Sequence, residues 1–112
     1  MAFVAVAKTS EIAPGSMKKV VVEGKEILLA NVGGSFYAVS ERCPHMGGHL
    51  SEGSIEDGIV TCPRHGSRFD VRTGQAVRGP KILFVRMGVG DNRGYPVTIE
   101  GADVLIDLQG SW

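Results

Sequence analysis

Sixteen glycines divide this chain into short apolar runs, and this spacing limits its fold more than any other feature. The runs are rich in Val, Ile, Leu, Phe and Tyr, which favour strands, and turn pairs such as Asp57-Gly58 separate them. No long stretch of the sequence has the 3.6-residue repeat of an amphipathic helix. The pattern therefore predicts an all-β fold, an antiparallel β-sandwich or a small barrel of short strands.

The expected strands follow from these runs and the turns between them. The pair Gly33-Gly34 predicts a tight hairpin, and Asp57-Gly58 predicts a second one. The runs VVV and ILLA are continuous rather than alternating, which suits strands covered on both faces but does not exclude helix. The segment MGVGDNRGYP reads as a loop. The expected strands are residues 3–7, 17–23, 26–32, 35–40, 59–61, 69–71, 75–77, 81–87, 97–100 and 104–108.

Length and charge set the class of protein. The 112 residues predict one domain, residues 1–112. Twelve basic residues balance twelve acidic ones, so the charge gives no argument for a nucleic-acid partner or an anionic membrane. No run approaches the roughly 18 apolar residues of a membrane span, and the N-terminus lacks the basic region of a signal peptide. We expect a soluble, cytoplasmic monomer with no nucleic-acid or membrane partner.

Two segments rich in glycine and proline each carry one cysteine and one histidine. CPHMGGHL begins at Cys43 and places His45 two residues later, and CPRHGSRFD begins at Cys62 and places His65 three residues later. A proline after each cysteine restricts the backbone, and the neighbouring glycines allow it to approach closely. Two loops that each offer a thiolate and an imidazole can form a four-ligand metal site.

Other interpretations leave part of this pattern unexplained. Simple burial of the cysteines, or a Cys43–Cys62 disulfide, does not account for the histidines, and a catalytic cysteine–histidine pair needs one cysteine only. Zinc accepts two Cys and two His, but its usual spacings pair like with like. A two-iron cluster with two Cys on one iron and two His on the other needs one of each from each loop. The order found here favours the [2Fe–2S] cluster, with zinc as the alternative.

These motifs resemble a known family. CPH from Cys43, followed by CPRHGS from Cys62, resembles the two-box signature of the Rieske iron–sulfur family. Residues 50–74 also resemble the link and second box of soluble Rieske-type ferredoxins, and the resemblance covers roughly residues 20–108. It implies a Rieske-like antiparallel β-sandwich or small barrel with an inserted cluster-binding subdomain of two loops, at about residues 41–80.

The resemblance also implies one [2Fe–2S] cluster per chain and a role for each candidate ligand. Cys43 and Cys62 would bind the buried iron, and His45 and His65 would bind the outer, partly exposed iron. The pair Gly79-Pro80 stands where the family has a proline-containing loop that covers the cluster.

Three positions depart from the Rieske proteins of respiratory complexes. Gly48 and Arg64 stand where those proteins have a second cysteine in each box, so their interloop disulfide is impossible here. Ser67 occupies the position of a serine that donates to a cluster sulfur, but Phe69 replaces a tyrosine donor. Fewer donors stabilise the reduced cluster less. We therefore expect a potential at the low end of the Rieske range of about −150 to +300 mV.

Size and motif together predict an electron carrier rather than an enzyme. The chain has no room for the mononuclear-iron domain of Rieske oxygenases, and its third histidine, His49, lies within the first box. We expect His49 to be an exposed loop residue, and residues 87–93 to be a partner-specific or merely tolerated insertion. The resemblance implies transfer of one electron at a time from a reductase to a terminal oxygenase or related oxidoreductase. The alternatives are a small Rieske-like subunit of a nitrite reductase and a zinc-stabilised binding module.

Overall fold

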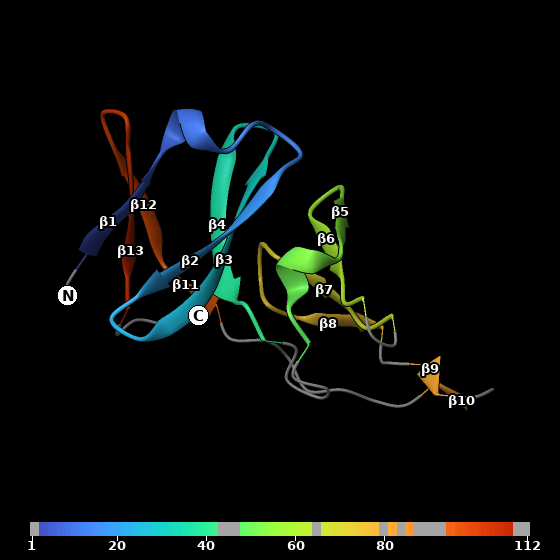
Figure 1. The fold of residues 1–112 in the computed structure, drawn as a ribbon. Coiled ribbons are helices and arrows are strands. Elements are labelled where there is room, and N and C mark those ends of the chain that lie inside the picture. Colours follow the sequence, from blue (N-terminus) through green and yellow to red (C-terminus); the bar gives the residue numbers. More distant parts are fainter. Residues whose placement is uncertain are drawn as a thin grey trace.

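The computed structural model describes residues 3–42, 48–63, 66–78, 81–82, 85–86 and 94–108. They form antiparallel strands and two short 3₁₀ helices (Figure 1). The helices are η1 (Thr9–Glu11) and η2 (Leu50–Glu52). The strands are β1 (Phe3–Lys8), β2 (Met17–Val22), β3 (Lys25–Val32), β4 (Ser35–Ser40), β5 (Ser54–Glu56), β6 (Ile59–Thr61), β7 (Arg68–Asp70), β8 (Ala76–Arg78), β9 (Lys81–Ile82), β10 (Val85–Arg86), β11 (Gly94–Tyr95), β12 (Val97–Glu100) and β13 (Asp103–Asp107).

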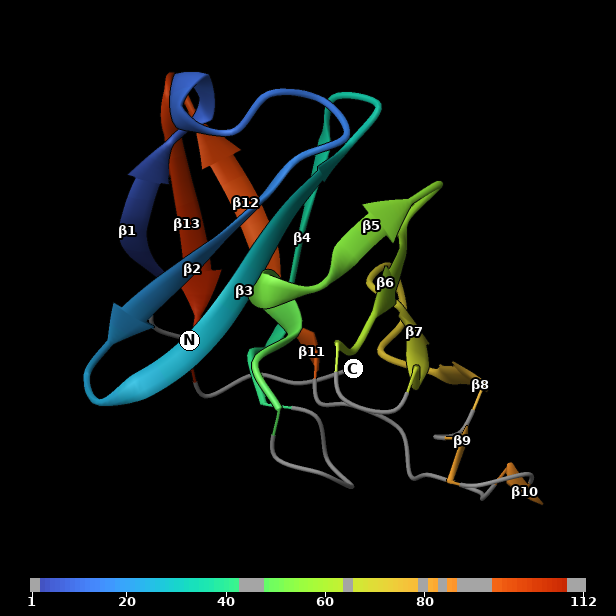
Figure 2. The same ribbon diagram turned by 45° about the vertical axis from the view of Figure 1, so that its right-hand side comes forward.

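A four-stranded sheet in the order β11-β4-β3-β2 lies at the centre of the molecule. The three-stranded sheet β1-β13-β12 lies on one side of it, and the small sheet β5-β6-β7-β8 lies on the other (Figures 1 and 2). The hairpin between β3 and β4 closes with Val32 opposite Ser35, across Gly33 and Gly34. Both glycines have positive φ, 61° and 98°, as tight two-residue turns of this kind require.

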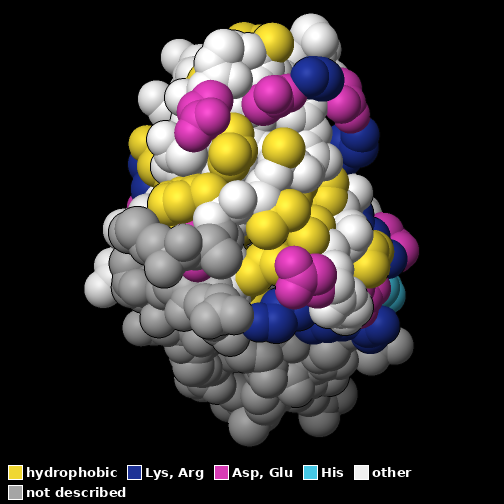
Figure 3. All heavy atoms as spheres, turned by 90° about the vertical axis from the view of Figure 1, so that its left-hand side faces the viewer, with side chains coloured by type: hydrophobic (Ala, Val, Ile, Leu, Met, Phe, Trp, Pro, Cys, Tyr) yellow, Lys and Arg dark blue, Asp and Glu magenta, His cyan; other side chains and the backbone are white. Residues whose placement is uncertain are grey.

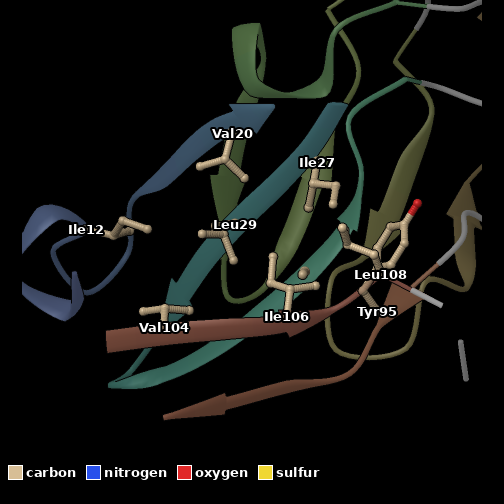
Figure 4. Close-up of a cluster of buried hydrophobic side chains, with 9 residues drawn as sticks. Ile12, Val20, Ile27, Leu29, Tyr95, Val104, Ile106 and Leu108 are labelled. Atoms are coloured by element: carbon tan, nitrogen blue, oxygen red, sulfur yellow. The ribbon is translucent and has the colours of Figure 1, made fainter. Parts of the chain in front are cut away.

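Strand β3 is covered on both faces, which explains its continuous apolar run. Successive side chains of a strand point to opposite faces. Ile27 and Leu29 point toward β13 and join one hydrophobic core (Figure 4). Leu28 and Ala30 join a second core, and all four side chains are completely buried. The second core also contains Val39, Leu50, Val60, Cys62, Phe69 and Val71. The central sheet therefore lies between the two cores and contributes side chains to both.

The all-β, antiparallel prediction is confirmed, but two details of the sequence analysis are wrong. The strand expected at residues 81–87 is interrupted, because β9 and β10 pair with each other as antiparallel segments. The loop expected before β12 contains a strand, β11, which pairs with β4. Tyr95 of β11 is only 4% exposed and belongs to the first core, so burial of one aromatic ring outweighs the local turn signal.

The surface carries both signs of charge. On the face nearest β1, acidic, basic and hydrophobic side chains are interspersed over the described residues (Figure 3). This mixture agrees with the balance of twelve basic and twelve acidic residues. In the described part of the chain, no helix has the length and apolar character needed to cross a membrane.

Candidate metal centre

One of the four predicted ligands, Cys62, lies among the described residues. Cys43, His45 and His65 lie outside them, as do Arg64, Gly79-Pro80 and residues 87–93. The geometry of the site is therefore built from Cys62 and from the segments that begin and end the two ligand loops.

Cys62 directly follows β6, and hydrogen bonds of its backbone fix its position. Its N–H donates to the carbonyl of Ser67 at 2.7 Å, and the N–H of Gly66 donates to the carbonyl of Cys62 at 3.2 Å. Gly66 adopts a φ of +78°, a conformation that glycine tolerates best. These bonds close the second loop at its base, between β6 and β7. The Cys62 residue is 2% exposed and packs in the second core, so its sulfur lies in a site from which water is largely excluded.

The hydroxyl of Ser67 is buried and has no hydrogen-bond partner among the described residues. Leaving such a group unsatisfied costs about 1–3 kcal/mol, so native structures rarely retain one without a reason. Ser67 is bonded through its backbone to Cys62, and a sulfur of a bound cluster would supply the missing acceptor. The buried thiol and the unpaired hydroxyl both fit an iron–sulfur group held at this loop.

Phe69 is completely buried two positions beyond Ser67. It pairs with Val60 of β6 and contributes an apolar ring to the second core. A phenylalanine carries no hydroxyl, so this position adds packing but no donor. The expectation of fewer donors than in respiratory Rieske proteins rests on this residue.

Gly53 brings the end of the first loop region against the second loop. A Cβ atom at Gly53 would lie 1.9 Å from the carbonyl oxygen of Thr61 and 3.2 Å from Cδ of Pro63. These two residues flank Cys62, so the absence of a side chain at Gly53 allows η2 to end against the Cys62 segment. The sequence analysis did not identify Gly53, because nothing in the local sequence shows that β6 approaches it.

Both ends of the first loop meet in a narrow neck. Arg42 and His49 form an isolated antiparallel bridge, and the N–H of Leu50 donates to the carbonyl of Glu41 at 2.9 Å. The Glu41 side chain is completely buried, and one of its carboxylate oxygens lies 3.1 Å from Nδ1 of His49. His49 is 27% exposed at its side chain, so it is a partly buried partner of Glu41 rather than the exposed residue expected.

The sequence analysis also missed Glu41. Its signal was an acidic residue two positions before Cys43, with the polar residues His49 at the far end of the first box and Ser51 just beyond it. An acidic side chain is rarely buried without partners. The partners of Glu41 lie eight and ten residues further along the chain, and only the fold brings them to it.

Comparisons with known proteins agree with this site. A family model described as the Rieske [2Fe-2S] domain matches residues 2–86. The ferredoxin component of biphenyl 2,3-dioxygenase from Rhodococcus jostii is 39% identical over 110 residues, which cover 98% of this chain and 96% of that protein.

Two solved structures have the same fold. The ferredoxin of carbazole 1,9a-dioxygenase from Nocardioides aromaticivorans superposes with a TM-score of 0.79 at 32% identity, over 95% of this chain and 97% of that one. A complex of reduced oxygenase and oxidized ferredoxin in carbazole 1,9a-dioxygenase matches with a TM-score of 0.80 at 27% identity, over 93% and 91% of the two chains. The chain belongs to the Rieske [2Fe-2S] family and is a ferredoxin of that family.

Proposed function

We propose that this protein carries single electrons from a reductase to a terminal oxygenase or a related oxidoreductase. The observation that carries the proposal is the buried, unpaired hydroxyl of Ser67 beside Cys62, in a chain that resembles dioxygenase ferredoxins along nearly its whole length. A bound [2Fe–2S] cluster supplies the one-electron chemistry. The protein acts as a component of a multicomponent oxygenase system and not as an enzyme by itself.

The proposed ligands are Cys43 and Cys62 for one iron and His45 and His65 for the other, with one cluster per chain. They lie in a cluster-binding part at about residues 41–80 of a single domain that spans residues 1–112. The chain's own residues have separate tasks. Cys62 binds from a buried position, Ser67 donates a hydrogen bond, and the apolar second core keeps water from the buried side of the site.

The proposed partners are a reductase that donates electrons and an oxygenase that accepts them. A ferredoxin bound to its oxygenase is described for the carbazole system, which supports direct docking of a carrier of this fold. We further propose that the protein is a cytoplasmic monomer with neither a nucleic-acid nor a membrane partner. The relatives named as dioxygenase ferredoxins favour this function over a small nitrite-reductase subunit or a zinc-stabilised module.

Spectroscopy and metal content test the cofactor. We expect the purified protein to be red-brown, to contain two irons per chain, and to give a reduced EPR spectrum with the low average g-value of a cluster with histidine ligands. His65→Cys and Cys62→Ser variants are expected to lose that spectrum, whereas Ser54→Ala, at an exposed position of β5, keeps it. A colourless protein that contains zinc would overturn the proposal.

Electron transfer tests the partners. The reduced protein is mixed in a stopped-flow instrument with an oxidised Rieske dioxygenase and, in parallel, with a nitrite reductase. We expect transfer to the dioxygenase at a rate that depends on protein concentration and no transfer to the nitrite reductase. The reverse preference would identify the protein as a nitrite-reductase component.

A further inference from the structure

The first ligand loop begins after β4 and ends at η2, and its two ends meet in the neck formed by Glu41, Arg42, His49 and Leu50. Glu41 follows β4 directly, and its N–H donates to the carbonyl of Glu26 at 3.2 Å. This bond fixes the start of the first ligand loop to β3. On the return side, the N–H of Leu50 donates to the carbonyl of Glu41. These backbone hydrogen bonds join the two ends of the loop.

The side chain of Glu41 supplies three more contacts, all with the return side of the loop. Its Oε1 accepts from the N–H of Ser51 at 3.1 Å. Its Oε2 accepts from the hydroxyl of Ser51 at 2.6 Å and lies 3.1 Å from Nδ1 of His49. One residue at the start of the loop therefore holds two residues at its end.

The carboxylate of Glu41 is completely buried, which makes its three partners essential. A buried carboxyl group is costly unless its oxygen atoms are hydrogen-bonded. The partners of Glu41 satisfy both oxygens, and replacing the residue with an apolar one leaves the partly buried groups of Ser51 and His49 without their acceptor.

Charged side chains of β2 and β3 lie next to the neck. Nδ1 of His49 lies 3.9 Å from a carboxylate oxygen of Glu26. Glu26 is itself paired with Arg42 and with Lys19, each at 3.0 Å. Acidic and basic groups therefore alternate from β2 through β3 to both sides of the neck, and they reinforce its geometry.

We propose that Glu41 is a positioning residue for the iron–sulfur site: its carboxyl group clamps the two ends of the first ligand loop, which contains Cys43. This inference rests on the proposed ligands Cys43 and His45, which lie in the clamped loop. Ligand geometry tight enough for function needs support from residues outside the ligand set. The neck of the loop is where the chain offers that support.

Three variants test the proposal in the intact protein. Glu41→Gln keeps the shape and replaces one acceptor oxygen with an amide group, Ser51→Ala removes one contact and keeps the carboxyl group, and Glu41→Ala removes all three contacts. Glu56→Gln, at an exposed position of β5, is the matched control. The measurements are iron per chain, the EPR spectrum of the reduced protein, the potential by redox titration, and the rate of cluster loss to excess chelator.

We expect Glu41→Gln to change the EPR line positions and to speed cluster loss, while the iron content of the purified protein stays normal. Ser51→Ala is expected to change the line positions at nearly constant potential. Cluster loss from Glu41→Ala is expected to be about tenfold faster or more, the effect typical of lost outer-shell support. The control is expected to behave as the parent protein in every measurement.

Parent values of the potential, the line positions and the cluster lifetime in both Glu41→Gln and Ser51→Ala would overturn the clamp, even if Glu41→Ala fails to fold. Failure of the underlying function looks different. In that case the parent protein itself lacks the EPR spectrum of a cluster with histidine ligands, before any variant is compared.

Discussion

Ser67 and Phe69 lie two positions apart on one segment, and both side chains are completely buried. Their chemistry differs, because serine offers a hydroxyl and phenylalanine offers none. Reduction adds negative charge to a bound cluster, and each donor to its sulfurs stabilises that charge. We therefore expect Ser67 to raise the potential by donating to a cluster sulfur, and Phe69 to add no such contribution.

Replacing Ser67 with alanine is expected to lower the potential, because the reduced state loses a donor. A bond worth about 1.4 kcal/mol changes the reduction equilibrium tenfold, which is about 59 mV for one electron. Redox titration of Ser67→Ala beside Ser54→Ala, a control at an exposed position of β5, measures the difference. An unchanged potential in Ser67→Ala would show that the hydroxyl does not face the cluster.

Glu26 predicts a pH dependence of stability. The hydrogen bond from Lys19, and then that from Arg42, lowers the pKa of Glu26 below its ordinary value of 4.5. A lowered pKa in the folded state means that the ionised carboxylate stabilises the fold. That contribution is complete above the unfolded pKa and disappears as the pH falls through the folded one.

The difference in Tm between the parent protein and Glu26→Gln is therefore expected to be largest near pH 7 and to shrink as the pH falls below about 4.5. Thermal unfolding followed by circular dichroism from pH 7 to pH 3.5 measures it. Lys19→Met, which removes the foremost partner, is expected to weaken the pH dependence. A difference that is constant over this range would contradict the assignment.

At the scale of elements, the sequence predicts what local patterns determine. The Gly33-Gly34 hairpin, the Asp57-Gly58 hairpin and the apolar run of β3 all appear as expected. What the sequence does not predict depends on contacts between distant segments. The strand β11 exists because Tyr95 fills a core, and the neck exists because Glu41 meets residues beyond the first box.

The candidate site shows the same division. The ligand pattern is local, so the two boxes identify the family from sequence alone. The expected exposure of His49 is wrong because its partner Glu41 lies eight residues away, across the loop. Gly53 was missed because its requirement for glycine comes from the carbonyl of Thr61 in another strand.

Gly53→Ala tests the close approach of η2 to β6. The added Cβ would overlap the carbonyl oxygen of Thr61, so one of the two segments has to move. We expect a loss of at least about 1–3 kcal/mol in the free energy of unfolding, together with faster cluster loss, because Cys62 adjoins Thr61.

Gly101→Ala is the matched control, because its φ is +61° and a Cβ there meets no atom within 4 Å. It is expected to cost about 1–2 kcal/mol through backbone strain alone and to leave the cluster's lifetime unchanged. Chemical unfolding and chelator challenge of both variants give the comparison. Equal cluster lifetimes in the two variants would argue against a tie between Gly53 and the Cys62 segment.

On the scale of the whole molecule, the central sheet joins two cores that have different tasks. One core lies between the central sheet and the sheet β1-β13-β12, and the other contains Cys62 and Phe69. Neighbouring residues of β3 belong to different cores, Leu28 to the core with Cys62 and Leu29 to the other. The same strand thus supports both the scaffold and the site.

The pair Leu28→Ala and Leu29→Ala separates these tasks. Each change removes a completely buried leucine side chain, and each is expected to cost about 2–5 kcal/mol of unfolding free energy. In Leu28→Ala the visible absorption of the cluster is expected to disappear at a lower denaturant concentration than the far-ultraviolet circular dichroism. In Leu29→Ala the two transitions are expected to coincide, and identical behaviour of the two variants would contradict the division.

The double-sided burial of β3 has a consequence for protein engineering. The two proposed ligand loops and the sheet β5-β6-β7-β8 form a segment that invites transfer to another scaffold. Their inner surface, however, is completed by Leu28, Ala30 and Val39 of the central sheet. A recipient protein must therefore offer a pair of strands with apolar side chains on both faces, one toward its own core and one toward the transplanted segment. Most soluble host proteins expose polar side chains on such a sheet face. A transplant without the apolar side chains of the central sheet is therefore expected to aggregate before it binds iron.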